Sequence, residues 1–455
     1  VLAMGDELGI EHDFAIKEMA DRVVADIGVL KTFPPAPWRS RRMEFVNGMS
    51  ANERFGCLSN WVRCGFDKLS LEQNPDTWIS IVVNNRADRI ARSRVFASIV
   101  VKDISYDRCV LIGNNLTGLI SYIKESWAEW IGTITLNSKD ESPEDIMLRM
   151  AQRFRVPYTQ DLLEQRLSIM VKAQDEAVDI AAVLKLMDQP DKLAAYLLEQ
   201  NIAHYQVIVD FLRQSSEQLI SYNDFLKLIE QANGKVSDGL EKNFHDLLWC
   251  WFEQKLVVVE DYYATGNQVI EFIGNATPPG FYNKIMGIQN IKGTGLDFVY
   301  RWQAWDTCYK ACQQLCSPSA AESTIGLRAL ASFQEHGVLT EETVRTAISK
   351  MLDSAIAQNE YYQAELGVIK ANLDRSVESL ASQGGGQKKT GNTWLTKVYS
   401  ALEAFLDAGD AVKRRKKANQ IYKDLVSERI SHERAALELQ KINKRQKGGW
   451  LKIGN

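Results

Sequence analysis

The stretch WISIVVNNRADRIARS (residues 78–93) passes directly from an apolar run into a charged loop. An apolar run of this length between polar residues is typical of a central strand in a parallel sheet. Ligands bind at the carboxyl ends of such strands, and arginines there offer forked donors for carboxylate or phosphate. The alternative is a solvated helix start, in which Asp88 favours the helix dipole and the arginines face water.

An upstream segment repeats this order. Glu44–Asn47 reads as the end of a strand, Gly48 as a turn, and the following residues as an amphipathic helix that Ser50 or Asn52 is expected to cap. The segment therefore predicts a second strand–loop–helix unit.

A third unit follows downstream. Arg108–Gly113 is a short apolar strand ending in glycine, then come Asn114 and Asn115, then a helix to about Trp130. Three such units in succession predict a doubly wound, Rossmann-like α/β domain with its polar loops at one edge of the sheet.

The segments VNGMSAN (46–52), VNNRADRIARS (83–93) and VLIGNN (110–115), in this order, resemble the C-terminal ligase domain of the poly-γ-glutamate synthases (the CapB or PgsB family), relatives of the Mur ligases. The resemblance covers residues 1 to about 137. Two positions depart from the family pattern. Asn85 stands where the family usually has Cys, and Glu53-Arg54 stand where Asp-Pro is usual.

The resemblance implies a bacterial, ATP-dependent amide ligase with ATP and Mg²⁺ as cofactors. A γ-carboxyl group is phosphorylated and then attacked by the amine of an incoming glutamate. It also implies catalytic roles for two residues: Arg86 would bind the anionic groups, and Asp88 would orient one arginine or receive the amine of the incoming glutamate. Arg92 and Arg94 lie further along the helix and are expected to be solvated. The substrate-binding roles fall to Arg89 and to three asparagines, for each of which a turn or capping role is the alternative: Asn47, Asn52 and Asn114.

The phosphate-loop pattern Gly-x-x-x-x-Gly-Lys-Ser/Thr is absent from the sequence. Gly384–Thr390 is a lookalike that we interpret as a linker, and Gly293–Gly295 is expected to be a turn, because no strand–helix context is evident.

Val1–Met4 begins within an amphipathic pattern, so we expect a fragment whose ATP-binding domain lies upstream. The alternative is a family member that lost this domain and works as a partner subunit.

From about residue 142 the periodicity becomes helical. Ser142 with Pro143 is a good helix start, and residues 142–376 are expected to form a mostly α-helical domain of unknown role. Residues 377–393 read as a Gly-rich linker. Residues 394–455 read as a basic helical tail that contains the cluster Lys413–Lys417. This helix is expected to lie on anionic lipid, to bind a polyanion or simply to face solvent.

Composition limits the classes of function. The net charge of −4 gives no sign of nucleic-acid binding, and seven cysteines in 455 residues suggest a reducing compartment without a disulfide framework. Cys308, Cys312 and Cys316 share a helical face and are expected to pack in a core. The five histidines are scattered and form no metal or nucleophile motif.

Two functional classes follow. In the first, the chain is part of a γ-glutamyl ligase that acts on glutamate or poly-γ-glutamate. This enzyme is expected in the cytoplasm or at the inner face of the membrane, where a membrane-embedded subunit is a possible partner. The second is a non-catalytic binding or scaffold subunit that recruits a polyanion, a membrane or a partner protein.

Overall fold

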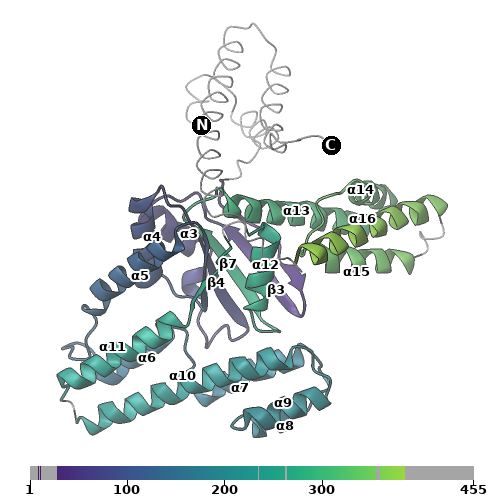
Figure 1. The fold of residues 1–455 in the computed structure, drawn as a ribbon. Coiled ribbons are helices and arrows are strands. Elements are labelled where there is room, and N and C mark those ends of the chain that lie inside the picture. Colours follow the sequence, from purple (N-terminus) through teal and green to yellow (C-terminus); the bar gives the residue numbers. More distant parts are fainter. Residues whose placement is uncertain are drawn as a thin grey trace. The chain divides into compact units, whose positions relative to one another are not determined.

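In the computed structural model, one mixed seven-stranded sheet has the order β1-β3-β7-β4-β5-β6, and β2 pairs with β3 off this path (Figure 1). The structure describes residues 28–233, 235–261, 264–354 and 359–384, with positions 9 and 11. The predicted N-terminal helix and basic tail lie outside these residues. The strands are β1 (Lys31–Thr32), β2 (Ala36–Trp38), β3 (Arg41–Asn47), β4 (Thr77–Asn85), β5 (Arg108–Gly113), β6 (Leu256–Val258) and β7 (Tyr282–Ile288).

The predicted central strand is confirmed. All nine residues of β4 are buried, as expected for a strand covered on both faces. β4 pairs in parallel with β5 and β7, and β3 also pairs in parallel with β7. The three predicted strand–loop–helix units are therefore β3–α3, β4–α4 and β5–α5 of a parallel sheet, with antiparallel strands only at its β1–β2 side.

Strand β7 was not foreseen from the sequence. It lies between β3 and β4, so that Ile285 stands opposite both Phe45 and Ser80. Its segment follows Pro278-Pro279-Gly280 and mixes polar with apolar residues, which made it read as irregular. The region 142–376 is mostly helical, as predicted, but it also supplies β6 and β7, so the sheet combines residues from both sides of the expected boundary.

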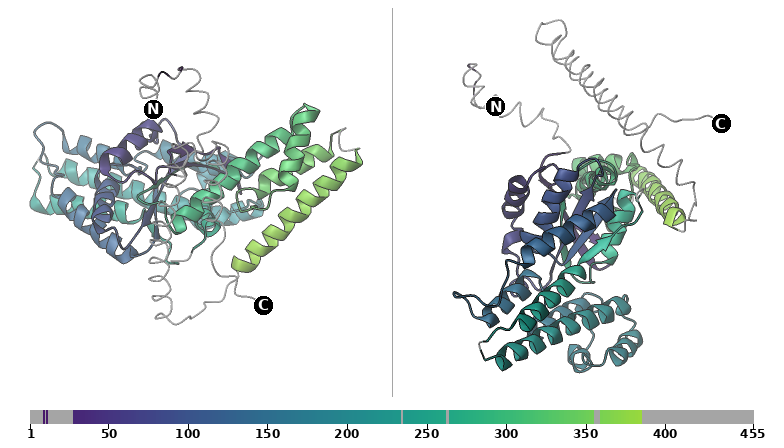
Figure 2. Two further views of the ribbon diagram at one scale, coloured as in Figure 1. Left: turned by 90° about the horizontal axis from the view of Figure 1, so that it is seen from above. Right: turned by 60° about the vertical axis from the view of Figure 1, so that its left-hand side comes forward.

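Helices cover both faces of the sheet (Figures 1 and 2). On one face α3 (Arg54–Arg63), α4 (Ile90–Lys102) and α5 (Leu116–Ile131) pack against alternate strand residues such as Ile81 and Leu111. On the other face α12 (Gly266–Asn275) and α13 (Thr294–Leu315) pack against the intervening residues, including Phe45 and Val82. The face opposite the three predicted helices is thus covered by helices from much later in the chain.

Helix α6, helix α11 and the short helix η1 add to the core on the α3–α5 face, and the other remaining helices form two groups. One group lies below the sheet in Figure 1 and buries Trp78 and Phe281 against α7 to α10, while the other packs α14 to α16 on the end of α13. None of the helices among the described residues is long and apolar enough to cross a membrane. Their bounds are α6 (Pro143–Arg153), α7 (Gln160–Lys172), α8 (Ile180–Lys185), α9 (Pro190–Glu199), α10 (Tyr205–Gln231), α11 (Asp238–Glu253), η1 (Phe66–Lys68), α14 (Ala320–Ala331), α15 (Glu341–Leu352) and α16 (Glu360–Gly384).

Helix starts and stops follow the sequence signals. Ser142 caps α6 by accepting from the Asp145 backbone N–H, with Pro143 in the first helical turn, as predicted. The predicted start of the linker at residue 377 is wrong, because α16 continues to Gly384, and residues 385–393 lie outside the described residues.

A buried charge cluster joins the amino ends of β4 and β5 to helices α6 and α7. The Asp107 carboxylate accepts from the Ile79 backbone N–H and from Arg155 Nε, both at 2.8 Å, and Arg166 Nη2 lies 3.8 Å away. Burial alone would raise the pKa of Asp107, but Arg155, Arg166 and Lys255 outweigh it and lower this pKa. One carboxylate thus compensates several buried cations.

Asp107→Asn is expected to lower the free energy of unfolding at pH 7 by about 3–5 kcal/mol, because it leaves Arg155 and Arg166 buried without a carboxylate. The pKa of Asp107 is lower in the folded state, so this contribution is present above pH ~4 and is lost as pH falls through the folded value. Urea unfolding at pH 7 and at lower pH measures the effect. Asp224→Asn, in an exposed pair with Lys227, is the control and should change stability by less than about 1 kcal/mol. Equal effects of the two substitutions would contradict the assigned role.

Lys255 gives a second pH dependence of the same sign, in a higher pH window. Burial, opposed by the nearby Asp107, lowers the pKa of Lys255 to about 7. Between pH 7 and pH ~10 the unfolded chain carries a proton on this lysine that the folded chain lacks, so stability should rise with pH across this window. Lys255→Met is expected to remove this slope and to be more stable than the unmodified protein at pH 7. Parallel unfolding curves of the two proteins from pH 7 to pH 9.5 would show that the folded lysine remains charged.

Candidate functional site

Four parallel strands end side by side at the edge where the sequence placed the polar loops. The register sets Asn47 of β3 opposite Gly287 of β7, and Asn85 of β4 opposite Gly113 of β5. The helices that follow β3 and β4 cover one face, whereas α13, which follows β7, covers the other. The carboxyl end of β7 is therefore a switch point of the kind at which open α/β sheets bind ligands.

Asn85 links three of these loops. Its Nδ2 donates to the carbonyls of Asn114 at 2.8 Å and Asn115 at 3.1 Å. Its Oδ1 accepts from Ser93 Oγ at 2.6 Å and from Gln289 Nε2 at 2.8 Å. The side chain is 1% exposed, so these bonds replace water completely. A cysteine at this position would lack the amide that makes this set of bonds.

Asn84 joins β4 to the loop after β7. Its Nδ2 donates to the carbonyls of Asn290 at 2.8 Å and Lys292 at 2.7 Å, and Asn290 Nδ2 donates back to the Asn84 carbonyl at 3.1 Å. A Cβ at position 295 would lie 2.2 Å from Asn84 Nδ2, so the close approach requires Gly295.

The interpretation of Gly293–Gly295 as a turn without strand–helix context is corrected by this geometry. The segment comes four residues after the end of β7, Gly293 is the N-cap of α13 with φ +64°, and α13 begins at Thr294. The pattern was missed because β7 itself was not recognised.

Arg86, Asp88 and Arg89 form a charged cluster on the loop after β4. Arg86 donates to Asp88 through Nε at 3.0 Å and Nη2 at 2.8 Å, and Arg89 Nε lies 3.6 Å from the same carboxylate. Asp88 lies before the helix start, since Arg89 is the N-cap residue of α4. The carboxylate therefore holds the two arginines together at a partly exposed surface.

Arg92 departs from the expectation that it is simply solvated. Its Nη1 donates to Asn290 Oδ1 at 2.6 Å, and its side chain is only partly exposed. Burial and the nearby Arg89 and Arg86 lower its pKa, while Asp88 acts in the opposite sense. Arg94, on the outer side of the same helix, is exposed as expected, and its guanidinium lies 5.1 Å from the Tyr122 ring centre.

The first polar loop differs in part from its prediction. Glu53, and neither Ser50 nor Asn52, caps α3, accepting from the backbone N–H groups of Gly56 at 2.6 Å and Phe55 at 3.0 Å. Glu53 thus keeps an acidic cap where the family usually has Asp. The next residue, Arg54, pairs with Asp103 at 2.6 Å.

The three candidate asparagines have different surroundings. Asn47 is buried at the end of β3, where its Oδ1 accepts from the Met49 backbone N–H at 3.4 Å. Asn52 is exposed. Asn114 supports the arginine loop, because its Oδ1 accepts from the Ala87 backbone N–H at 2.5 Å.

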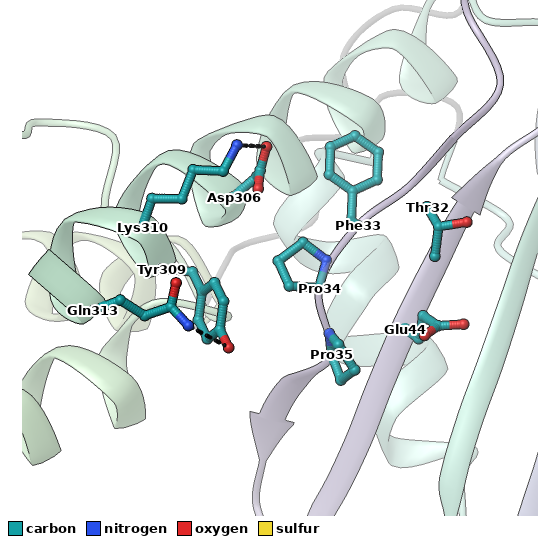
Figure 3. Close-up of a pocket in the computed structure, with 9 residues that line it drawn as sticks. All are labelled: Thr32, Phe33, Pro34, Pro35, Glu44, Asp306, Tyr309, Lys310 and Gln313. Atoms are coloured by element: carbon teal, nitrogen blue, oxygen red, sulfur yellow. Dashed lines mark hydrogen bonds and ion pairs between the residues drawn. The ribbon is translucent and has the colours of Figure 1, made fainter.

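A hollow of about 410 Å³ lies elsewhere, between the β1–β2 connection and α13 (Figure 3). Its Asp306 forms ion pairs with Lys31 at 2.7 Å and with Lys310 at 3.1 Å. The hollow is lined by Thr32, Phe33, Pro34, Pro35, Glu44, Asp306, Tyr309, Lys310 and Gln313. None of these residues belongs to the loops that follow β3, β4, β5 and β7. The candidate site at the carboxyl edge is therefore a surface cluster, separate from this hollow.

The polar groups at the carboxyl edge are amides, arginines and one carboxylate. The amide N–H and guanidinium donors suit anions, and a single carboxylate among arginines does not fit a magnesium ion. No group of three or more His, Cys, Asp or Glu residues arranged to hold a metal occurs in the part of the chain that the structure describes.

Cys308 and Cys312 are buried in the α13–α16 core, as expected from their spacing, and Cys316 packs against it.

The arrangement defines an open α/β sheet domain with an arginine-rich loop at its switch point. Residues 32–200 match the family model of the poly-gamma-glutamate synthase CapB C-terminal domain, which confirms the resemblance to that family. The chain is 29% identical over 154 residues to PGA synthase CapB of Bacillus subtilis (strain 168), covering 33% of this chain and 37% of that relative. No solved structure gives a significant match.

The loop after β7 lies outside the matched segment and contributes Gln289, Asn290 and Lys292 to the site edge. Sequence reasoning missed these residues. The signal that would have found them is the Gly-x-Gly of residues 293–295, which follows the run Tyr282–Ile288 after four residues.

Asn85→Ala is expected to lower the free energy of unfolding by about 1–3 kcal/mol, since it leaves buried partners of the three loops unsatisfied. Thermal or urea unfolding measures this change. Asn52→Ala is the matched control at an exposed asparagine and should leave stability within about 0.5 kcal/mol. Indistinguishable stabilities of the two variants would argue against the linking role of Asn85.

Proposed function

We propose that this chain provides the acceptor-binding α/β part of an ATP-dependent amide ligase that adds glutamate through γ-carboxyl linkages. The observation that carries the proposal is the Arg86–Asp88–Arg89 cluster. It lies after a central parallel strand, within the segment that matches the CapB C-terminal domain. Because the chain spans 37% of its curated relative, the complete reaction is assigned to a larger enzyme than the described residues.

The chemistry explains why this cluster combines both signs of charge. In such a ligation the γ-carboxyl becomes an acyl phosphate, the amine of the incoming glutamate attacks it, and phosphate leaves. Arg86 and Arg89 would bind the carboxylates or the acyl phosphate, where charge-assisted bonds are strongest. Asp88 would receive the ammonium of the incoming amino acid, so that the proton lost on attack leaves toward a carboxylate.

The Arg86–Asp88 ion pair is weak enough for a ligand to displace it. The pair is partly exposed, with 25% of the Arg86 side chain and 56% of the Asp88 side chain accessible. Exposed pairs are worth about 0–1 kcal/mol, so a ligand carboxylate can displace Asp88 from Arg86 at little cost.

ATP and Mg²⁺ are assigned to another part of the enzyme. The sequence lacks the phosphate-loop pattern, and the carboxyl-edge donors do not fit the metal. When bound there, ATP with Mg²⁺ would supply the phosphoryl group, while the residues of this chain orient the acceptor.

Arg86→Ala in the complete enzyme is expected to reduce glutamate-dependent ADP formation by roughly 10²-fold or more, since a group that stabilises developing charge is removed. Coupled measurement of ADP release checks this. Arg63→Ala, an exposed arginine at the other end of α3, is the control and should retain activity. Undiminished turnover in Arg86→Ala would remove the loop from the mechanism.

The alternative is that the chain is a scaffold subunit. This hypothesis predicts a different result for the same experiment: the complete assembly binds glutamate or its polymer without forming ADP. The basic cluster Lys413–Lys417 is compatible with a polyanionic product or an anionic membrane surface at the cytoplasmic side in either case, and it lies outside the described residues.

A further inference from the structure

Arg92 is held in place by the loop that follows β7. Its Nη1 donates to Asn290 Oδ1 at 2.6 Å, and Asn290 is only 3% exposed. Asn290 is itself fixed by the reciprocal bonds with Asn84 of the central strand. Arg92 is therefore anchored through Asn290 to the loop after β7 and to the central strand, and the residue is partly exposed.

The charges around Arg92 do not balance. Arg86 and Arg89 both pair with the Asp88 carboxylate, and both also lie near enough to Arg92 to repel its charge, which Asp88 alone attracts. Three guanidinium groups and one carboxylate leave an excess of two positive charges. Like charges this close repel, and an anionic ligand relieves that repulsion.

The charged groups form two regions, each with one excess positive charge. Asp88 with Arg86 and Arg89 lies on the exposed loop, with more than half of the Asp88 and Arg89 side chains accessible. Arg92 lies deeper, against the loop after β7. A ligand that reaches both regions carries two anionic groups, one for each.

We propose that Arg92, positioned by Asn290, makes the site select acceptors with two carboxylates over acceptors with one. The proposal rests on the proposed function, and it deepens that function by naming a specificity-determining residue outside the Arg86–Arg89 loop. Glutamate has the required α- and γ-carboxylates, with an ammonium for Asp88. Glutamine has nearly the same shape but replaces the γ-carboxylate by a neutral amide.

Calorimetric titration of the full chain with glutamate and with glutamine, each as the D- and L-form, tests this. A charge-assisted hydrogen bond contributes about 1.5–3 kcal/mol, so glutamate should bind roughly 10- to 100-fold more tightly than glutamine. Arg92→Ala should reduce this ratio to nearly one while leaving the affinity for glutamine largely unchanged. Arg92→Lys, which keeps the charge, should restore part of the ratio.

Two further variants separate positioning from charge. Asn290→Asp should lower the ratio, because a fixed carboxylate then neutralises Arg92. Arg94→Ala removes an arginine from the outer side of the same helix and should leave the ratio unchanged. Thermal unfolding of each variant identifies any that fail to fold, in which case Arg92→Lys and Asn290→Asp carry the test.

The outcomes distinguish this proposal from the one on which it rests. An unchanged glutamate/glutamine ratio in Arg92→Ala, or an equal loss of both affinities, overturns the selectivity. If Arg86→Ala also weakens glutamate binding in that case, the acceptor site survives and only the role of Arg92 falls. Unaltered glutamate binding in Arg86→Ala overturns the acceptor site itself, and no measurable binding of either ligand overturns both.

Discussion

The insertion of β7 between β3 and β4 is the constraint on which the rest of the structure depends. Without it, both neighbours would present a row of unpaired backbone N–H and C=O groups in the middle of the molecule. β7 pairs with both along nearly its whole length, and it brings α12 and α13 onto the face that α3, α4 and α5 leave uncovered. The first part of the chain therefore completes its sheet only with a strand from much later.

The same strand organises the candidate site. Its following loop supplies Gln289 to the Asn85 network and Asn290 to Arg92, so the arginine loop after β4 is supported from both neighbouring strands. Buried amides suit this task, because each has donors and an acceptor that satisfy several loop carbonyls and side chains at once. The arginines are thereby held near one another with too few carboxylates to neutralise them, which is the electrostatic character expected of an anion-binding edge.

The opposite edge of the sheet has a structural role. Asp107 ties β4 to Arg155, after α6, and to Arg166 on α7, and so fixes the helices below the sheet. These charges are almost completely buried, and Arg166 also lies against the rings of Trp78, Phe211 and Phe281. Such a cluster is costly to desolvate and very costly to break, so it determines the arrangement more than it adds stability. Strongly charged residues thus serve packing at one edge and are accessible to ligand at the other.

Local sequence determined the parts of the protein whose signals are local. The apolar run 78–83, the loop after it and the Ser142-Pro143 start predicted β4, the arginine loop and α6, because burial, capping and turn chemistry act over a few residues. The sequence also carried the family resemblance. Only the tertiary structure decided that β7 completes the sheet, that Glu53 caps α3, and that Arg92 faces Asn290 while Arg94 faces outward. Strand pairing joins segments far apart in the chain, and the direction of a charged side chain depends on the neighbours that this pairing brings to it.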